Sequence, residues 1–214
     1  MAAPEESVSK GDSRRSQRAA ETRLKLLSAS AELLAERGYS RLATAAIAKR
    51  AGVAHGTLFK HFATKTELMA ATTERVLEEV IGEFLRRAQQ FAGQPEPIDH
   101  ALNAVWSLFR SERLQATLEL YVAARTDDSL RDALRPIFAT HRSAFLSAAR
   151  ALLPDSADGA HFESNVTGIL ATLLGGALLW SVVPEPEFFQ SERAFVDRIT
   201  RAELARLGSQ NGER

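Results

Sequence analysis

Two short helical segments joined by a tight turn constrain the fold of this chain more than any other feature of its sequence. Residues 44–51 and 55–62 have apolar residues at helical spacing, and the turn between them is Gly52-Val53-Ala54. Glycine permits the positive backbone angle that such a turn requires. Two short helices joined in this way are typical of a helix-turn-helix.

The rest of the chain is also predicted to be helical, so the expected fold class is all-α. Apolar residues predict a first helix from Thr22 that ends at Gly38, and Thr64-Lys65-Thr66-Glu67 has the form of a capping box that begins a long helix ending near Gly93. Sustained alternation of apolar and polar residues, which would indicate strands, is not found. Further helices are expected at residues 98–110, 113–125, 129–153, 162–183 and 188–207, with Pro136 starting or kinking its segment.

Charge is distributed unevenly along the 214 residues, although the 27 basic and 27 acidic side chains cancel overall. Residues 1–70 hold 12 Lys and Arg against 7 Asp and Glu, so this part carries +5 and the remainder −5. The two parts are therefore expected to have different partners. Residues 1–20 are rich in Ser, Glu, Lys and Arg without apolar periodicity, which predicts a flexible basic arm.

The sequence contains no pattern of an enzyme or a metal site. Cysteine is absent, which excludes disulfides and thiolate chemistry, and residues 1–20 lack the apolar core of a secretory signal, so a cytoplasmic location is expected. A glycine-rich phosphate loop, a Gly-x-Ser-x-Gly elbow and a paired histidine motif are all missing. We therefore predict no catalytic residues, no metal and no cofactor.

Residues 164–184 carry no charge, and their length raises the question of a membrane span. Polar residues interrupt the segment, acidic residues flank it, and no Lys or Arg cluster marks one end, so we predict no membrane association. A helix buried on most sides fits better. Gly168, Gly175 and Gly176 would allow another backbone to approach, which favours subunit pairing, while a central core helix of a monomer stays open.

The segment from Thr44 to Leu68 resembles the tetracycline-repressor (TetR) family of bacterial transcription regulators. The family pattern Thr-x-x-Ile-Ala-x-x-Ala-Gly-Val-Ser-x-Gly-Thr-Leu-Tyr-x-x-Phe-x-x-Lys matches without gaps, and the match is strong over residues 22–70. The remainder resembles the family only in length, helix count and layout. Ala54 replaces the usual Ser and Phe59 the usual Tyr, so two hydroxyls that could reach the DNA backbone are lost.

The resemblance implies a set of DNA-binding residues. Thr44 and Lys65 match family positions that grip phosphates and would position the protein. The second short helix would present its outward side chains to the major groove, where Lys60 could bond guanine acceptors. The complete predicted set is Thr44, His55, Gly56, Thr57, Phe59, Lys60, His61 and Lys65.

The resemblance also implies a C-terminal domain that binds a small-molecule effector and dimerises. Helices at residues 162–183 and 188–207 would form a four-helix interface between two subunits. A mostly apolar pocket is expected among Trp106, Phe109, Tyr121, Arg125, Phe138 and His141, because ligand pockets combine apolar walls with a few polar groups. Packing of an ordinary core stays open for each of these residues.

Together these inferences predict a homodimeric regulator, favouring a repressor, that binds a palindromic operator in double-stranded DNA. The expected divisions are an arm at residues 1–20, a DNA-binding domain at 21–67, an effector-binding and dimerisation domain at 68–208 and a disordered tail at 209–214. A helical enzyme and a structural dimer without DNA binding stay open as alternatives.

Overall fold

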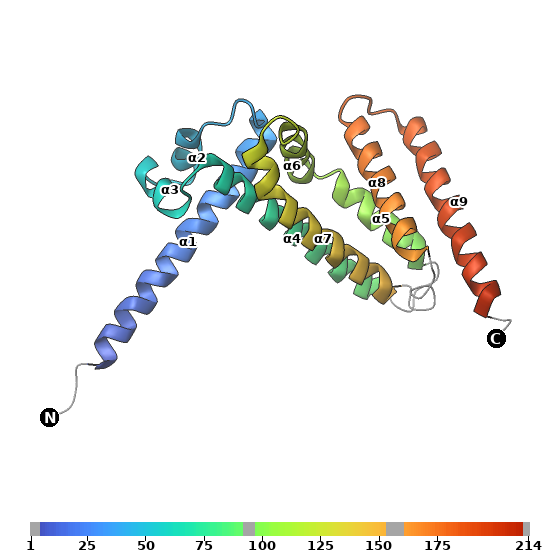
Figure 1. Ribbon diagram of the computed structural model, residues 1–214, viewed down its shortest axis with the longest axis horizontal. Helices are drawn as coiled ribbons and strands as arrows, with labels where there is room; N and C mark the ends of the chain where they lie inside the picture. Colours follow the sequence, from blue (N-terminus) through green and yellow to red (C-terminus); the bar gives the residue numbers. More distant parts are fainter. Residues whose placement is uncertain (1–4, 92–96, 153–160, 212–214) are drawn as a thin grey trace. The chain divides into compact units, whose positions relative to one another are not determined.

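The computed structural model describes residues 5–91, 97–152 and 161–211, and every regular element within them is an α-helix (Figure 1). The helices are α1 (Glu5–Arg37), α2 (Thr44–Arg50), α3 (His55–His61), α4 (Lys65–Phe91), α5 (Pro97–Phe109), α6 (Glu112–Ala123), α7 (Asp128–Leu152), α8 (Phe162–Trp180) and α9 (Pro186–Asn211). This order confirms the predicted all-α fold, and the predicted helices agree with it to within a few residues at most ends. Pro136 lies inside α7.

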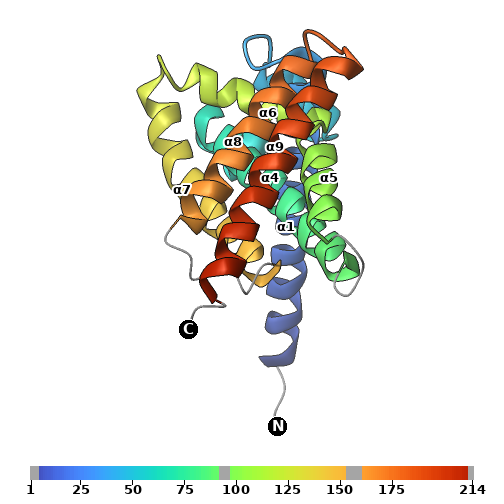
Figure 2. The same ribbon diagram turned by 90° about the vertical axis from the view of Figure 1, so that its right-hand side faces the viewer.

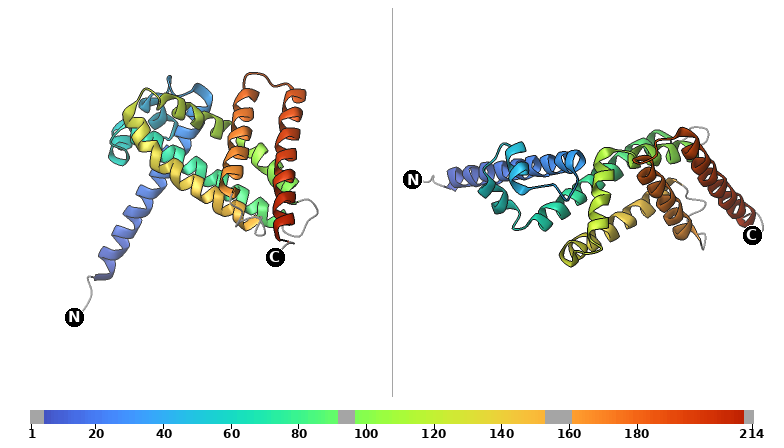
Figure 3. Two further views of the ribbon diagram at one scale, coloured as in Figure 1. Left: turned by 45° about the vertical axis from the view of Figure 1, so that its right-hand side comes forward. Right: turned by 90° about the horizontal axis from the view of Figure 1, so that it is seen from above.

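The two ends of the chain differ from the prediction. Helix α1 begins at Glu5, where the sequence predicted a flexible arm over residues 1–20. Residues 13–20 are all exposed, so they carry no apolar stripe, but their Arg, Gln and Ala residues extend a helix well. Figure 3 shows this half of α1 running away from α2 and α3. Helix α9 likewise continues to Asn211, into the predicted tail, of which residues 212–214 lie outside the described part.

The chain forms two compact units that are not consecutive in sequence. Residues 1–76 and 116–134 form the first unit, and residues 77–115 and 135–214 form the second. Helices α4, α6 and α7 each run from one unit into the other. The sequence analysis placed one boundary near residue 67, because local patterns do not reveal that residues 116–134 pack with the N-terminal helices.

The core of the first unit holds the helix-turn-helix. Leu34 of α1, Ile47 of α2 and Leu58 of α3 are completely buried, and Phe62 is buried just beyond α3. Burying each such side chain contributes about 1.5–3 kcal/mol. The chain changes direction between these helices at Gly38 and Gly52, whose φ angles are 73° and 69°. Both are in the left-handed region, which favours glycine.

In the second unit α8 packs against α9 and α5 (Figure 2). Aromatic rings line this packing: Phe189 of α9 contacts Trp180 and Trp106, with ring centroids 4.6 and 5.4 Å apart. Nearby, the ring of Phe145 from α7 contacts Phe84 and Phe109. These contacts fix the faces of α8 and α9 that point into the unit.

Much of α8 is nevertheless uncovered. Phe162–Trp180 is long and apolar enough to span a bilayer by length and composition, yet only 22% of its most apolar window is buried. The sequence analysis expected burial on most sides. Gly176 is buried against the Glu192 carboxylate of α9, whereas Gly175 faces open space. Large apolar residues remain exposed on and near these helices, namely Leu178, Leu179, Val182, Val183, Phe195 and Ile199.

Candidate nucleic-acid interface

Helices α2 and α3 are set by the turn between them. Val53 N–H donates to the Ala48 carbonyl at 3.0 Å, and Gly52 N–H donates to the Lys49 carbonyl at 3.2 Å. Ala43 and Ala54 occupy the N-cap positions in extended conformation without a side-chain hydrogen bond. The first amides of both helices are therefore not capped by side chains and can bind an external anion.

Helix α3 has one face turned inward and one turned outward. Leu58 is completely buried, while His55, Gly56 and Lys60 are exposed and Phe59 is 44% exposed. Thr57 and His61 are half-buried. A Cβ added at Gly56 would meet no atom within 4 Å, so the backbone there is open to an approaching ligand. The outward side of α3 thus presents His55, Gly56, Phe59 and Lys60, while Thr57 and His61 are only partly exposed.

Thr44 and His55 contact each other across the helix-turn-helix. Thr44 Oγ1 lies 3.0 Å from His55 Nε2 and forms a hydrogen bond with it. The His55 ring also meets the edge of Phe59, with centroids 5.0 Å apart. The sequence analysis assigned these residues to DNA separately and missed their mutual contact, because their spacing of eleven residues becomes close only through the turn.

Lys65 is held in place at the start of α4. Its ammonium donates to the Tyr39 carbonyl at 3.2 Å and lies 4.3 Å from the centre of the Tyr39 ring. Burial lowers the pKa of Lys65. The Glu119 carboxylate fixes Tyr39 in turn by accepting its N–H at 2.8 Å. Lys65 is thus a half-buried and oriented cation rather than a mobile one.

The predicted capping sequence stabilises the same end of α4. Thr64 Oγ1 accepts the N–H of Glu67 at 3.0 Å, and the Glu67 carboxylate accepts the N–H of Ala63 at 2.7 Å. Both bonds occupy amides that the helix itself leaves free. The helix start that carries Lys65 is therefore rigidly defined.

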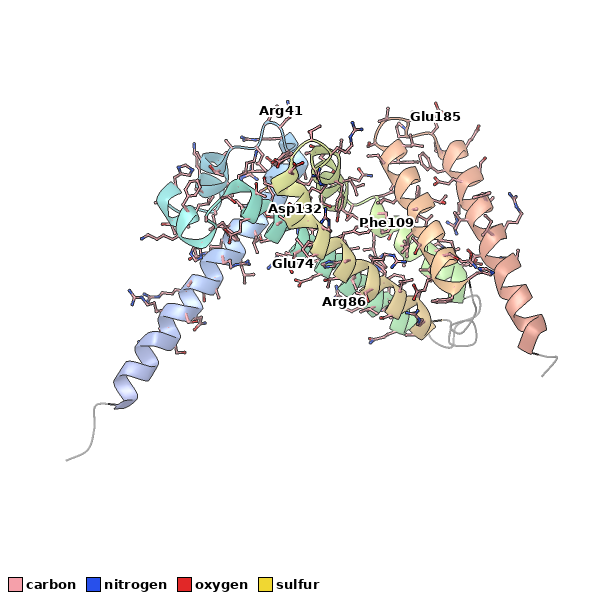
Figure 4. The ribbon with its side chains drawn as sticks, viewed as in Figure 1. Arg41, Glu74, Arg86, Phe109, Asp132 and Glu185 are labelled. Atoms are coloured by element: carbon pink, nitrogen blue, oxygen red, sulfur yellow. The ribbon has the colours of Figure 1, made fainter. Side chains whose placement is uncertain are left out.

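Arg50 is a structural residue that sequence reasoning missed. Its guanidinium donates to both carboxylate oxygens of Glu36 at 2.8 Å and joins α2 to α1. The side-chain hydrogen bonds from Arg50 lower the pKa of Glu36. Arg50 is thus engaged within the protein, whereas Lys49 of α2 and Lys60 of α3 are exposed. Arg41, labelled in Figure 4, adds an exposed cation in the loop before α2.

The residues predicted for an effector pocket fall into different surroundings. Trp106 and Phe109 of α5, with Phe138 and His141 of α7, lie in the second unit, whereas Tyr121 and Arg125 lie in the first. Phe109, labelled in Figure 4 at the end of α5, is buried in the core.

The members of this set also differ in exposure. Phe138 is 55% exposed and Arg125 is exposed, while buried His141 has Nδ1 2.7 Å from the Ile137 carbonyl. Burial raises the pKa of Tyr121 to about 12. Of the six residues, Trp106 lines a pocket between α5, α8 and α9, which is bounded by Leu102, Trp106, Leu173, Phe189, Glu192, Arg193 and Val196. In the part of the chain that the structure describes, no three His, Asp or Glu side chains form a metal-binding group.

Comparisons with known proteins agree with this geometry. Residues 26–72 match the family described as bacterial regulatory proteins, tetR family. An uncharacterized HTH-type transcriptional regulator of Mycobacterium tuberculosis is 33% identical over 194 residues, which cover 88% of this chain and 97% of that protein.

Solved structures show the same fold at lower identity. A TetR-family transcriptional regulator from Streptomyces coelicolor superposes with a TM-score of 0.61 at 21% identity, over 87% of this chain and 99% of the other. The multidrug binding protein EbrR, complexed with imidazole, has a TM-score of 0.60 at 19% identity and covers 83% of this chain and 93% of its own.

Proposed function

Because the chain belongs to the tetR family of bacterial regulatory proteins, it is a DNA-binding transcriptional regulator and not an enzyme, and we propose that it is a ligand-responsive repressor. The repressor works as a homodimer on a palindromic operator and releases it when a small molecule binds the second unit. A regulator acts where the DNA is, so the proposed location is the cytoplasm.

The observation that carries the proposal for DNA is the outward face of α3. It offers the donors of Lys60, His55 and Thr57 around an open backbone at Gly56. A helix with such a face fits the major groove, which is about 12 Å wide. Thr44 and Lys65 flank it and serve as phosphate contacts, and the uncapped amides of α2 and α3 add to them.

The proposal for a homodimer rests on α8 and α9. Leu178 and Leu179 of α8 and Phe195 of α9 are large apolar side chains that a single chain leaves exposed. Exposed apolar residues gathered in this way mark interaction sites in soluble proteins, and a second copy would cover them by a twofold interface. Pairing also explains why a helix with the composition of α8 is so little buried within its own chain.

The dimer represses by occupying the operator. It releases the operator because binding of the effector and binding of DNA are thermodynamically coupled. A dimer reads two successive major grooves when its α3 helices lie about 34–36 Å apart. An effector that binds better to a dimer with another spacing lowers operator affinity. The likeness to EbrR, which was solved with imidazole, supports a small molecule in this fold. The aromatic residues of the middle helices favour a mostly apolar one.

In-vitro selection of bound duplexes from a random library tests this function. The full chain should enrich a palindrome, and Lys60→Ala should enrich a different sequence, because Lys60 reads bases. Glu187→Gln, a change of an exposed residue on α9, is the matched control and should return the wild-type palindrome. Enrichment of no sequence would contradict operator binding, and enrichment of a single unrepeated half-site would contradict the dimer.

A further inference from the structure

Phe59 places an aromatic ring on the outward side of α3. It is 44% exposed, whereas its neighbour Leu58 is completely buried in the core of the first unit. Of the eight residues predicted to contact DNA, Phe59 alone has a large apolar side chain. An apolar ring in water gains free energy when a partner covers it. A partner of α3 that offers an apolar group would therefore be held by Phe59.

Two contacts in series hold the Phe59 ring in place. The rings of His55 and Phe59 form a T-shaped pair, with centroids 5.0 Å apart and an interplanar angle of 70°. Thr44 Oγ1 and His55 Nε2 form a hydrogen bond of 3.0 Å, which ties the imidazole to the start of α2. Edge-to-face aromatic pairs are favourable beyond the area that they bury. Phe59 is thus an oriented ring, which loses little conformational entropy when it binds a partner.

The other flank of this ring is open. Residues three and four positions apart are neighbours on the surface of a helix, so His55 and Gly56 both adjoin Phe59 from the preceding turn. A Cβ built at Gly56 would meet no atom within 4 Å. Since Gly56 has no side chain to cover the ring, a small group can approach the ring and the Gly56 backbone together.

The chemistry of the major groove identifies such a group. The bases are distinguished there by hydrogen-bond donors and acceptors, and thymine adds the apolar 5-methyl group beside its O4 acceptor. Phe59 lacks the hydroxyl of a tyrosine, so its side chain can neither donate a hydrogen bond to a phosphate nor accept one from a base. The thymine methyl group is therefore the partner in this groove that suits a phenyl ring.

We propose that Phe59 recognises the 5-methyl group of one thymine in each half-site of the operator. The methyl group packs on the phenyl ring in the open space beside Gly56, and His55 keeps the ring in position. The contact rests on the proposed function, since Phe59 meets a base only if α3 lies in the major groove. It gives Phe59 a role in base recognition, in place of the backbone contact that its missing hydroxyl excludes.

Deoxyuridine tests the contact, because it lacks the methyl group of thymidine and keeps every hydrogen-bonding atom of the base. The palindrome selected by the full wild-type chain is resynthesised with uracil at each thymine position in turn, in both half-sites. Fluorescence anisotropy at one fixed salt concentration gives the affinities. At one symmetric pair of positions, uracil should weaken binding about fourfold per half-site and about 15-fold in the dimer, because one apolar carbon is no longer buried there.

Three variants show whether Phe59 receives that methyl group. Phe59→Ala should bind the thymine and uracil operators equally, because its side chain is too short to reach the base. Phe59→Leu keeps a large apolar side chain and should retain part of the preference. Lys60→Ala, which changes a neighbouring polar contact, is the matched control and should keep the full preference. Each preference is a ratio of two affinities of one protein, so a fraction of unfolded protein cancels in it.

The methyl contact and DNA binding can fail separately in this experiment. A wild type that binds its selected operator but tolerates uracil at every position overturns the contact and leaves the regulator intact, and so does a selected operator without thymine. A uracil penalty that persists undiminished in Phe59→Ala overturns the assignment to Phe59. Failure to select any duplex contradicts the contact and the proposed function together.

Discussion

At the scale of single residues, Glu192 shows how a buried carboxylate oxygen can weaken the folded protein. Its Oε2 lies buried without a hydrogen-bond partner among the described residues. An unsatisfied buried polar atom costs about 1–3 kcal/mol, and the cost falls when the carboxyl is protonated or replaced.

We therefore expect Glu192→Gln to raise the free energy of unfolding at pH 7. Burial raises the pKa of Glu192 in the folded state above its ordinary value near 4.5. The folded protein consequently holds more protons than the unfolded chain in that window, so wild-type stability falls as pH rises from about 4.5 through the raised pKa. Urea titrations at several pH values should show this fall in the wild type and in Glu187→Gln, and a flatter profile in Glu192→Gln.

Lys60 and Lys65 should separate base readout from phosphate contact. Lys65 is oriented by Tyr39, so Lys65→Ala should weaken binding to all DNA sequences about equally and lower the salt slope by about 1 per contact, or about 2 per dimer. Lys60→Ala should change sequence preference instead. Fluorescence anisotropy on operator and random duplexes across salt concentrations measures both quantities. If both variants lose affinity for operator and for random DNA in the same ratio, the division into base readout and phosphate contact is wrong.

At the scale of elements, two glycines of the helix-turn-helix have opposite roles. Gly52 has a φ of 69°, so Gly52→Ala forces a side chain into the left-handed region and should destabilise the protein by about 1–2 kcal/mol. Gly56 is helical and open, so Gly56→Ala should leave stability unchanged or slightly higher yet weaken operator binding, because its methyl group lies between helix and DNA. Thermal unfolding measures the stability of each variant, and fluorescence anisotropy measures its operator affinity. A loss of stability in Gly56→Ala would contradict the placement of Gly56 on the face that binds DNA.

The sequence predicted elements better than contacts. The helix-turn-helix, the capping bonds of Thr64 and Glu67, and the exposure of Lys60 follow from local patterns, which is why they could be predicted. The Thr44–His55 and Arg50–Glu36 contacts depend on how helices cross, which local spacing does not encode. The same holds for Glu192: its charge is visible in the sequence, but its burial against Gly176 is a property of the packing of α8 on α9.

At the scale of the whole molecule, the exposed apolar surface of α8 and α9 predicts a dimer. Light scattering at micromolar concentration should give twice the chain mass of 23.4 kDa. Gly175→Arg places a charge on the open side of α8, and a buried unpaired charge costs several kcal/mol, so this variant should be a monomer. Val122→Arg, a similar change of an exposed residue on α6, should stay dimeric. A monomeric wild type would contradict the proposed interface.

Helix α6 carries one contact in each of the two units. Gln115 donates to the carbonyl of Ala177, the residue after Gly176, at 2.8 Å in the second unit. One turn later Glu119 accepts the N–H of Tyr39 in the first unit, and Tyr39 holds Lys65. If the second unit binds an effector as proposed, we expect a change at Ala177 to act along α6 on the contact of Glu119 with Tyr39.

This link predicts reciprocal coupling that depends on Glu119. For a coupling of about 1–3 kcal/mol, a saturating effector should weaken operator binding about 5-fold to 150-fold, and operator should weaken effector binding by the same factor. Glu119→Ala removes the acceptor for the Tyr39 N–H, so it should bring both factors toward one while the effector affinity of the DNA-free protein stays the same. Glu112→Ala, an exposed change on the same helix, is the control and should retain the full coupling. An effector found by screening Trp fluorescence is titrated by calorimetry into free and operator-bound protein, which measures the factor directly. Undiminished coupling in Glu119→Ala would show that the signal does not pass through this contact.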